Sequence, residues 1–201
     1  MVNPIQIFGL DVGKRKDPAS LLMGVMDTLP DGRHIYQVVF ARQWELGTPY
    51  PELAAAVRAT VNDPQVDRES ASLAIDVTAV GEPVADMICA GLEVPEHRIW
   101  ITGGNNWRRG DDGCYYVSKN LLVSCVKQMF GERRLLIVNS LKLCAAILSE
   151  IDSFQVKVSK AANELYEARE GKHDDLILAL AVMLWSGESL CLGPWDATVN
   201  P

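Results

Sequence analysis

Aspartates stand beside apolar segments at three widely separated places in this 201-residue chain. Asp11 and Asp76 each come at the end of a short apolar segment, and Asp174 and Asp175 directly precede the uncharged run 176–185. Carboxylates brought close together raise one another's pKa, and a divalent cation relieves that repulsion. Hard oxygen ligands suit Mg²⁺ or Mn²⁺, and pairs of such ions serve in-line displacement at phosphorus.

Asp174 also has a simpler explanation. The Leu-, Ala- and Met-rich run 176–185 predicts a buried helix, and an aspartate at its start can cap unpaired backbone N–H groups. Capping is the commoner role for such a residue when it is considered alone. Asp11 and Asp76 favour the metal interpretation, because the ends of neighbouring central strands lie side by side at one sheet edge.

The sequence does not decide between Asp174 and Asp175. Consecutive helical residues point about 100° apart, so one can bind metal while the other caps the helix or binds a second ion. We expect both to matter.

The composition restricts the class of protein. A net charge of −7 argues against coating nucleic acid through general electrostatics, but not against a nucleic-acid enzyme with local basic loops. Five cysteines without C-x-x-C spacing indicate reduced thiols and not a zinc site. The N-terminus lacks a signal-like pattern, and no uncharged stretch is long enough to span a membrane. We expect a cytoplasmic protein, in the host cytoplasm if phage-encoded.

Periodicity and turn signals predict an α/β fold. Strands 5–13, 20–28 and 34–44, with a turn at 30–33, form an antiparallel meander. Strands alternating with helices then extend it in parallel. These are strands 72–78, 98–102, 135–138 and 154–158, and helices from 48 to 61, from 81, 119–129 and 141–151. We expect one domain over 1–201, with a projecting loop or hairpin at about 103–117 and an irregular tail at about 187–201.

The motifs around the acids resemble those of a known family. Gly9 to Gly13 read GLDVG, 74–81 read AIDVTAVG and 171–176 read GKHDDL. Together with 101–104, 117–122 and 166–169, they resemble the nuclease domain of phage terminase large subunits, over roughly residues 5–185. That family has an RNase H-like, RuvC-like fold: a mixed sheet, with a three-strand antiparallel meander extended by parallel strands, flanked by helices.

The resemblance implies a function and site roles. Asp11 would bridge two Mg²⁺ or Mn²⁺ ions, Asp76 would bind one of them, and Asp174 with Asp175 would complete the site. A metal-activated water would hydrolyse double-stranded DNA, leaving a 3′-hydroxyl and a 5′-phosphate. The implied partners are DNA, a packaging ATPase domain, a small terminase subunit and a portal.

The chain departs from a full large terminase in one respect. It has no G-x-x-x-x-G-K-[ST] phosphate loop. It is therefore either an excised or separately encoded nuclease domain, or it serves another context. The alternatives are a RuvC-like junction resolvase and a non-catalytic RNase H-like docking module of a packaging motor.

Basic residues near the predicted site are candidates for phosphate contact. Each has an ordinary alternative, since charged turns are usually solvated and Trp107, beside two arginines, can serve as a loop anchor. His173 could bind metal or be a polar loop residue, and Asp111 and Asp112 look like turn acids. The DNA-binding candidates are Lys14, Arg15, Lys16, Arg108, Arg109 and Lys119.

Overall fold

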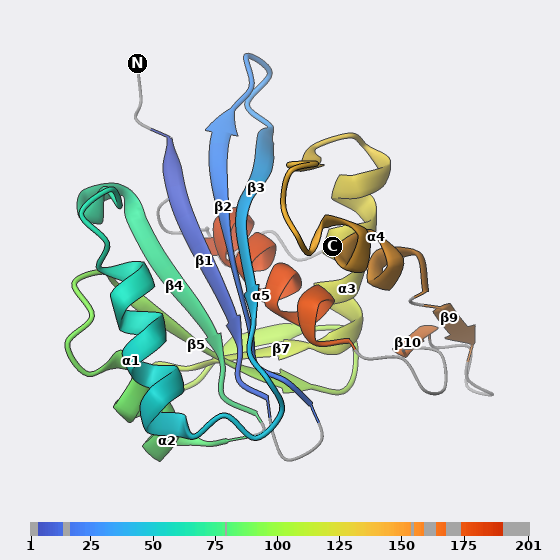
Figure 1. Ribbon diagram of the computed structural model, residues 1–201. Coiled ribbons are helices and arrows are strands. Elements are labelled where there is room, and N and C mark those ends of the chain that lie inside the picture. Colours follow the sequence, from blue (N-terminus) through green and yellow to red (C-terminus); the bar gives the residue numbers. More distant parts are fainter. Residues whose placement is uncertain are drawn as a thin grey trace.

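The computed structural model describes residues 4–13, 17–78, 80–153, 155–158, 164–167 and 174–190. Its main feature is an eight-stranded mixed sheet with the strand order β6-β7-β5-β4-β1-β2-β3-β8. Helices cover both faces of this sheet (Figure 1).

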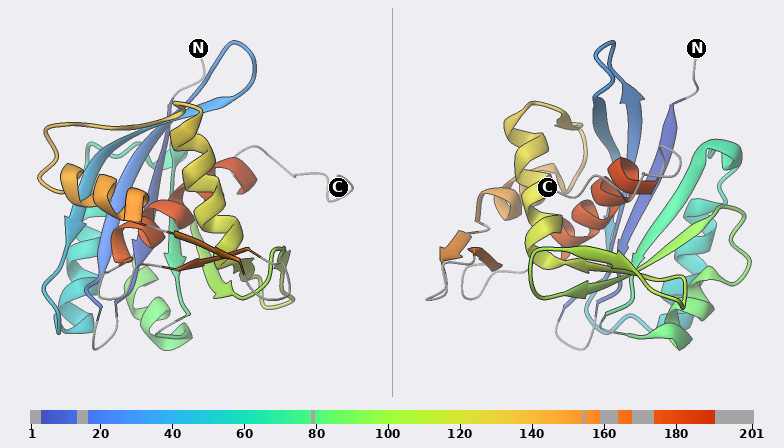
Figure 2. Two further views of the ribbon diagram at one scale, coloured as in Figure 1. Left: turned by 90° about the vertical axis from the view of Figure 1, so that its right-hand side faces the viewer. Right: turned by 180° about the vertical axis from the view of Figure 1, so that it is seen from behind.

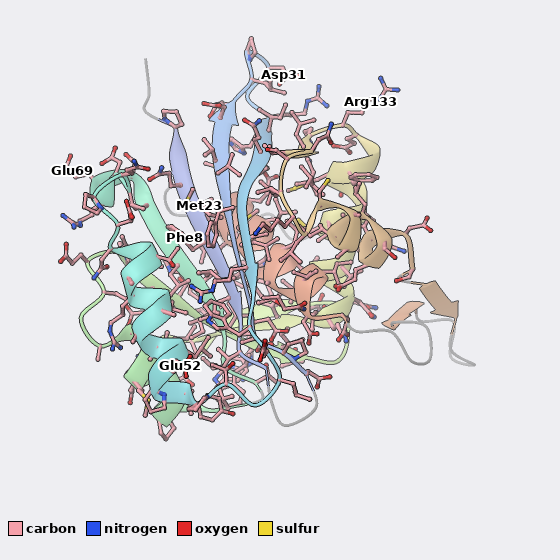
Figure 3. All side chains as sticks on the ribbon, in the orientation of Figure 1. Phe8, Met23, Asp31, Glu52, Glu69 and Arg133 are labelled. Atoms are coloured by element: carbon pink, nitrogen blue, oxygen red, sulfur yellow. The ribbon has the colours of Figure 1, made fainter. Side chains whose placement is uncertain are left out.

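The centre of the sheet is the meander that the sequence predicts. β1 (Ile5–Asp11), β2 (Ser20–Thr28) and β3 (His34–Gln43) pair antiparallel in chain order. The β2–β3 turn carries Asp31 at its tip, at the opposite end of the molecule from Glu52 in the first turn of α1 (Figure 3).

Parallel strands extend the meander on both sides. β4 (Ala71–Asp76) pairs with β1, followed by β5 (Glu96–Thr102) and β7 (Tyr115–Ser118). β8 (Leu135–Ile137) pairs in parallel with β3 at the other edge. The expected RNase H-like arrangement of a meander with parallel additions is therefore confirmed.

The helices form two layers with separate apolar cores. One core lies under α1 (Tyr50–Val61) and α2 (Glu82–Cys89), and a 3₁₀-helix (Arg68–Ser70) precedes β4. The other core lies under α3 (Lys119–Gly131), α4 (Cys144–Ser153) and α5 (Asp175–Leu190), on the opposite face (Figure 2). No helix in the described part of the chain is long and apolar enough to cross a membrane.

Glycine allows α5 to pack directly on the central strands. A Cβ at Gly9 would lie 2.1 Å from the carbonyl oxygen of Ala179 and 2.6 Å from the Cβ of Met183, so a side chain at Gly9 would clash with α5. This close approach brings the first residues of α5 to the end of β1.

Three features differ from the sequence prediction. The expected last strand, β9 (Gln155–Val158), pairs with β10 (Glu164–Glu167) in a separate two-stranded sheet and does not join the main one. The hairpin expected at about 103–117 is present as β6 (Trp107–Arg109) and β7, but its strands extend the main sheet at one edge. α5 continues to Leu190, past the predicted start of the irregular tail at about 187. A Cβ at Gly187 would lie 2.5 Å from the Tyr36 hydroxyl oxygen, so the glycine leaves room for Tyr36. The rest of the predicted tail, 191–201, lies outside the described residues.

Candidate functional site

Asp11 and Asp76 are direct neighbours at the end of the two central strands. They are the last residues of β1 and β4 and are register partners in that parallel pair. Side chains alternate along a strand, so Asp11 shares a face with Gly9, against which α5 packs. Both aspartates are nearly buried, with 7% and 6% of their surface exposed.

α5 contributes the third acidic position. Asp175 is its first residue and is 1% exposed, and Asp174 immediately precedes the helix. The four aspartates line one cleft of about 220 Å³ together with Asp17. The structure therefore brings together, from three elements, the acids that the sequence singled out. Their individual roles stay predictions.

The acids carry an electrostatic conflict. Burial raises the pKa of Asp11 well above its usual range, and the charges of Asp76, Asp175, Asp174 and Asp17 raise it further. Burial also raises the pKa of Asp76. A cation in the cleft would favour the ionised carboxylates and so oppose both shifts.

Thr78 fixes the orientation of Asp76. The Thr78 N–H donates to Asp76 Oδ1 over 2.8 Å. Hydrogen bonds from the backbone and the side chain of Thr78 oppose the rise in the pKa of Asp76 that burial causes. The Thr78 hydroxyl oxygen accepts from the Ile101 N–H over 2.6 Å, which ties the end of β4 to β5. The carboxylate of Asp76 is thus held at the C-terminal end of β4.

Glu150 is a neighbour of the site that the sequence did not reveal. Its Oε2 accepts a hydrogen bond from the Ile177 N–H in the first turn of α5 over 2.9 Å. Burial raises the pKa of Glu150 to about 7, and the charges of Asp175 and Asp174 contribute to the rise. Because this contact joins residues 27 positions apart, on two predicted helices, no local pattern indicated it.

Asp174 is held by a residue from another helix. Its Oδ2 lies 2.5 Å from the Nζ of Lys119, the first residue of α3, and its backbone carbonyl accepts from the Leu178 N–H. The Ile177 N–H in the first turn of α5 donates to Glu150. Lys119 therefore lies in the acidic cleft, as the sequence suggested.

Trp107 anchors the β6–β7 hairpin to the helical layer. Its ring lies 5.6 Å from that of Trp185 on α5 in an edge-to-face arrangement, and Trp185 also contacts Tyr115. The packing fits the alternative role of a loop anchor, because the indole is in contact with aromatic rings of the protein.

The two arginines of the hairpin point to opposite sides of the sheet. Arg109 lies over the ring of Tyr115, on the same face as Trp107 and α5, and Arg108 lies over the ring of Tyr116. Register pairing gives the same result, since adjacent strand residues alternate between faces. Of the two DNA-binding candidates, Arg109 therefore lies on the face covered by α5 and Arg108 on the opposite face.

The remaining candidates divide into two groups. Asp112 accepts hydrogen bonds from the Tyr116 hydroxyl and the Cys114 N–H within the hairpin, so it behaves as the turn acid that the sequence predicts. Lys14–Lys16 and His173 lie outside the described residues. Gly13 and Asp17, which flank the basic segment, line the cleft.

The donor set suits a hard cation. Carboxylate oxygens are the ligands that Mg²⁺ and Mn²⁺ prefer. Within the described part of the chain, no three carboxylate, imidazole or thiol groups are already arranged to coordinate one metal ion.

Large terminase nucleases are among the solved structures with the same architecture. The large terminase nuclease from thermophilic phage G20c is 19% identical, with a TM-score of 0.65, over 92% of this chain and 82% of that one. The chain has the large terminase nuclease fold. Among further neighbours, the human cytomegalovirus terminase nuclease domain is 12% identical over 91% of this chain and 83% of its own, with a TM-score of 0.56.

Two further observations concern the large terminase nuclease fold. The HK97 bacteriophage large terminase is 14% identical with a TM-score of 0.57, and the match covers 91% of this chain but 39% of that one. The sequence itself matches no family model and no curated protein. The likeness therefore lies in the three-dimensional arrangement of the chain.

Proposed function

We propose that this chain is the nuclease of a phage genome-packaging terminase: an endodeoxyribonuclease that hydrolyses double-stranded DNA with two divalent metal ions. The observation that carries the proposal is the alignment of Asp11 with Asp76 at the ends of the central strands, with Asp175 facing them from α5. The fold of large terminase nucleases supports it.

The metal ions would be held by the cleft aspartates. The G20c nuclease has been solved with bound magnesium and with bound cobalt, and the SPP1 large terminase nuclease domain with bound Mn, which supports a divalent ion here. Such ions, when bound, supply an activated water and stabilise charge on the phosphate. Asp11 stands between Asp76 and α5, so it is the residue suited to serve both ions.

Asp175 is the better candidate of the adjacent pair for binding metal. The Asp175 side chain is buried in the cleft that Asp11 also lines. Its charge raises the pKa of Asp11 more than the charge of Asp174 does. Asp174 is instead in contact with Lys119. We assign Asp175 to the metal ions and a separate role to Asp174.

DNA would reach the acidic cleft with the help of local positive charge. The chain carries a net charge of −7, so phosphate contacts must come from particular side chains. Lys119 lines the cleft, and Arg109 lies on the same face of the sheet. The segment Lys14 to Lys16 remains a further proposed contact.

Cleavage of supercoiled plasmid tests the proposal. We expect the parent protein to nick and linearise plasmid with Mn²⁺ or Mg²⁺ and not with chelator. Asp11→Asn, Asp76→Asn and Asp175→Asn should each lose more than about 100-fold in rate, since even partners of metal ligands cost 10–100-fold. Asp27→Asn is the matched control, because Asp27 is an exposed aspartate at the far end of β2.

Three results would contradict the proposal in different ways. Parental rates for Asp11→Asn would show that the site is wrong. Preference for four-way junctions over linear duplex would indicate a junction resolvase. Absence of divalent binding in calorimetry, together with absence of cleavage, would favour the non-catalytic docking module.

A further inference from the structure

We infer that Lys119 and Asp174 form a positioning pair, in which Asp174 holds the Lys119 ammonium in the cleft and Lys119 contacts a DNA phosphate there. This inference rests on the proposed nuclease function. It gives the two adjacent aspartates different tasks: Asp175 faces the metal ions, and Asp174 acts through Lys119.

The contact itself is close and accessible. Lys119 Nζ lies 2.5 Å from Asp174 Oδ2, and the two side chains are 33% and 25% exposed. Both line the acidic cleft. A phosphate arriving from solvent can therefore reach the ammonium without rearrangement of the fold, whereas the buried Asp175 is closed to it.

The ammonium also acts on a second carboxylate. Burial raises the pKa of Asp76, and the charge of Lys119 is among the influences that oppose this rise. Lys119 therefore lies within electrostatic reach of both Asp76 and Asp174, on either side of the cleft. Among the described residues that line the cleft, it is the one with a positive charge.

Lys119 occupies a helix position that local electrostatics disfavours. It is the first residue of α3, where the helix dipole favours negative charge, and the first turn contains no acid to compensate. The turn is fixed in place by the side chain of Ser118, which accepts from the Leu121 N–H over 3.2 Å. Asp174, directly before α5, holds the Lys119 ammonium in the cleft, so this lysine serves the cleft and does not stabilise α3.

The N-terminus of α3 and the ammonium together suit an anion. A lysine ammonium at the start of a helix, where the helix dipole also favours negative charge, suits a phosphate oxygen. In a cleft that is otherwise acidic, this is where the DNA backbone would find a counter-charge. The phosphate is recognised by its charge, so the contact is independent of base sequence.

Equilibrium binding of a short fluorescent duplex tests the pair separately from catalysis. Anisotropy is measured with Ca²⁺ in place of Mg²⁺, under conditions where gels show an uncut duplex, over a range of salt. We expect Lys119→Met to weaken binding about 5–10-fold and to reduce the slope of log Kd against log salt by about 1. Lys119→Arg should retain binding within about 3-fold, because it keeps the charge.

Asp174→Asn tests the positioning role. We expect it to weaken DNA binding less than Lys119→Met, and the double variant to match Lys119→Met alone, because the two residues act as a unit. Calorimetry with Mn²⁺ should give parental affinity, within about 3-fold, for Asp174→Asn and Lys119→Met, and loss of binding for Asp175→Asn. Lys127→Met, on α3 outside the cleft, is the matched control for both measurements.

Two outcomes would overturn the inference. One is a parental Kd and salt slope for Lys119→Met. The other is an equal loss of Mn²⁺ affinity in Asp174→Asn and Asp175→Asn, which would make Asp174 a metal ligand. Failure of the nuclease proposal is recognised differently, as a parent protein that neither binds Mn²⁺ nor cuts plasmid.

Discussion

At the scale of single residues, the cleft sets function against stability. Asp11 is buried next to three other aspartates of the site, and both burial and their charges raise its pKa. A protein selected for stability alone has no reason to collect such groups at the ends of its central strands. The cost of this arrangement should be measurable in the protein without metal.

We predict that Asp11→Asn stabilises the metal-free protein at neutral pH. A carboxyl whose pKa is raised by folding contributes stability below its unfolded pKa, about 4, and this contribution is lost as the pH rises through the folded value. The side-chain amide of the Asp11→Asn variant does not ionise, so the variant does not lose this stability as the pH rises. We expect the melting temperature to rise by about 2–4 °C, corresponding to roughly 1 kcal/mol.

Thermal unfolding in chelator between pH 4 and 8 measures this effect. The difference between Asp11→Asn and the parent should grow with pH and disappear near pH 4. Asp27→Asn should follow the parent throughout. A variant that melts below the parent at pH 8 would mean that Asp11 is already compensated inside the protein.

At the scale of elements, the site depends on how closely α5 approaches β1. Gly9 permits this contact, because any Cβ there would overlap the Ala179 carbonyl and Met183. The same contact aligns Asp175 with Asp11. The glycine in the GLDVG motif therefore has a packing role that is distinct from the chemistry of its neighbour.

We predict that Gly9→Ala moves α5 away from the sheet and damages the metal site. Overpacking of this kind typically costs about 1–3 kcal/mol. Denaturant unfolding should report that loss, and calorimetry should report weaker Mn²⁺ binding in the fraction that folds. Gly131→Ala is the control, since a Cβ there meets no atom within 4 Å. Parental metal affinity in Gly9→Ala would separate the packing of α5 from the geometry of the site.

Glu150 links the start of α5 to α4 through a titrating group. Burial raises its pKa to about 7, so its contribution to stability is present below about pH 4.5 and is lost as the pH rises through 7. Glu150→Gln keeps an acceptor oxygen for the Ile177 N–H without the charge. The melting temperature of the parent relative to Glu150→Gln should fall between pH 5 and pH 8, and a constant difference over that range would refute the assignment.

The elements show which parts of the site were accessible from sequence. Asp11 and Asp76 end strands with clear apolar patterns, so their side-by-side placement followed from the rule that parallel strands share an edge. The division between Asp174 and Asp175 depends on Lys119, which is 55 positions away from Asp174, and on the Glu150 contact. The separate sheet of β9 and β10 was missed for a similar reason: the partner of a strand depends on tertiary contacts, and the local sequence pattern does not determine it.

At the scale of the whole molecule, an acidic protein must bind DNA through a few well-placed cations. The hairpin at the sheet edge presents Arg109 on the face that carries the cleft and Arg108 on the other. A duplex lying across the cleft can meet the first arginine more readily than the second. Arg109 should therefore contribute more to DNA binding than Arg108, although the two are adjacent in sequence.

We predict that Arg109→Ala weakens duplex binding by about 3–10-fold and lowers the salt slope by up to about 1, whereas Arg108→Ala changes both much less. Anisotropy titrations at several salt concentrations measure the two variants in parallel. The reverse order would indicate that DNA approaches over the face covered by α1 and α2.

The most direct test of the central claim is the anomalous scattering of crystals soaked in Mn²⁺. We predict two manganese ions between the ends of β1 and β4 and the start of α5, with Asp11 contacting both. Asp76 and Asp175 should each bind an ion, and Asp174 should remain on Lys119. Crystals without manganese at these aspartates, under conditions in which the protein cuts plasmid, would contradict it.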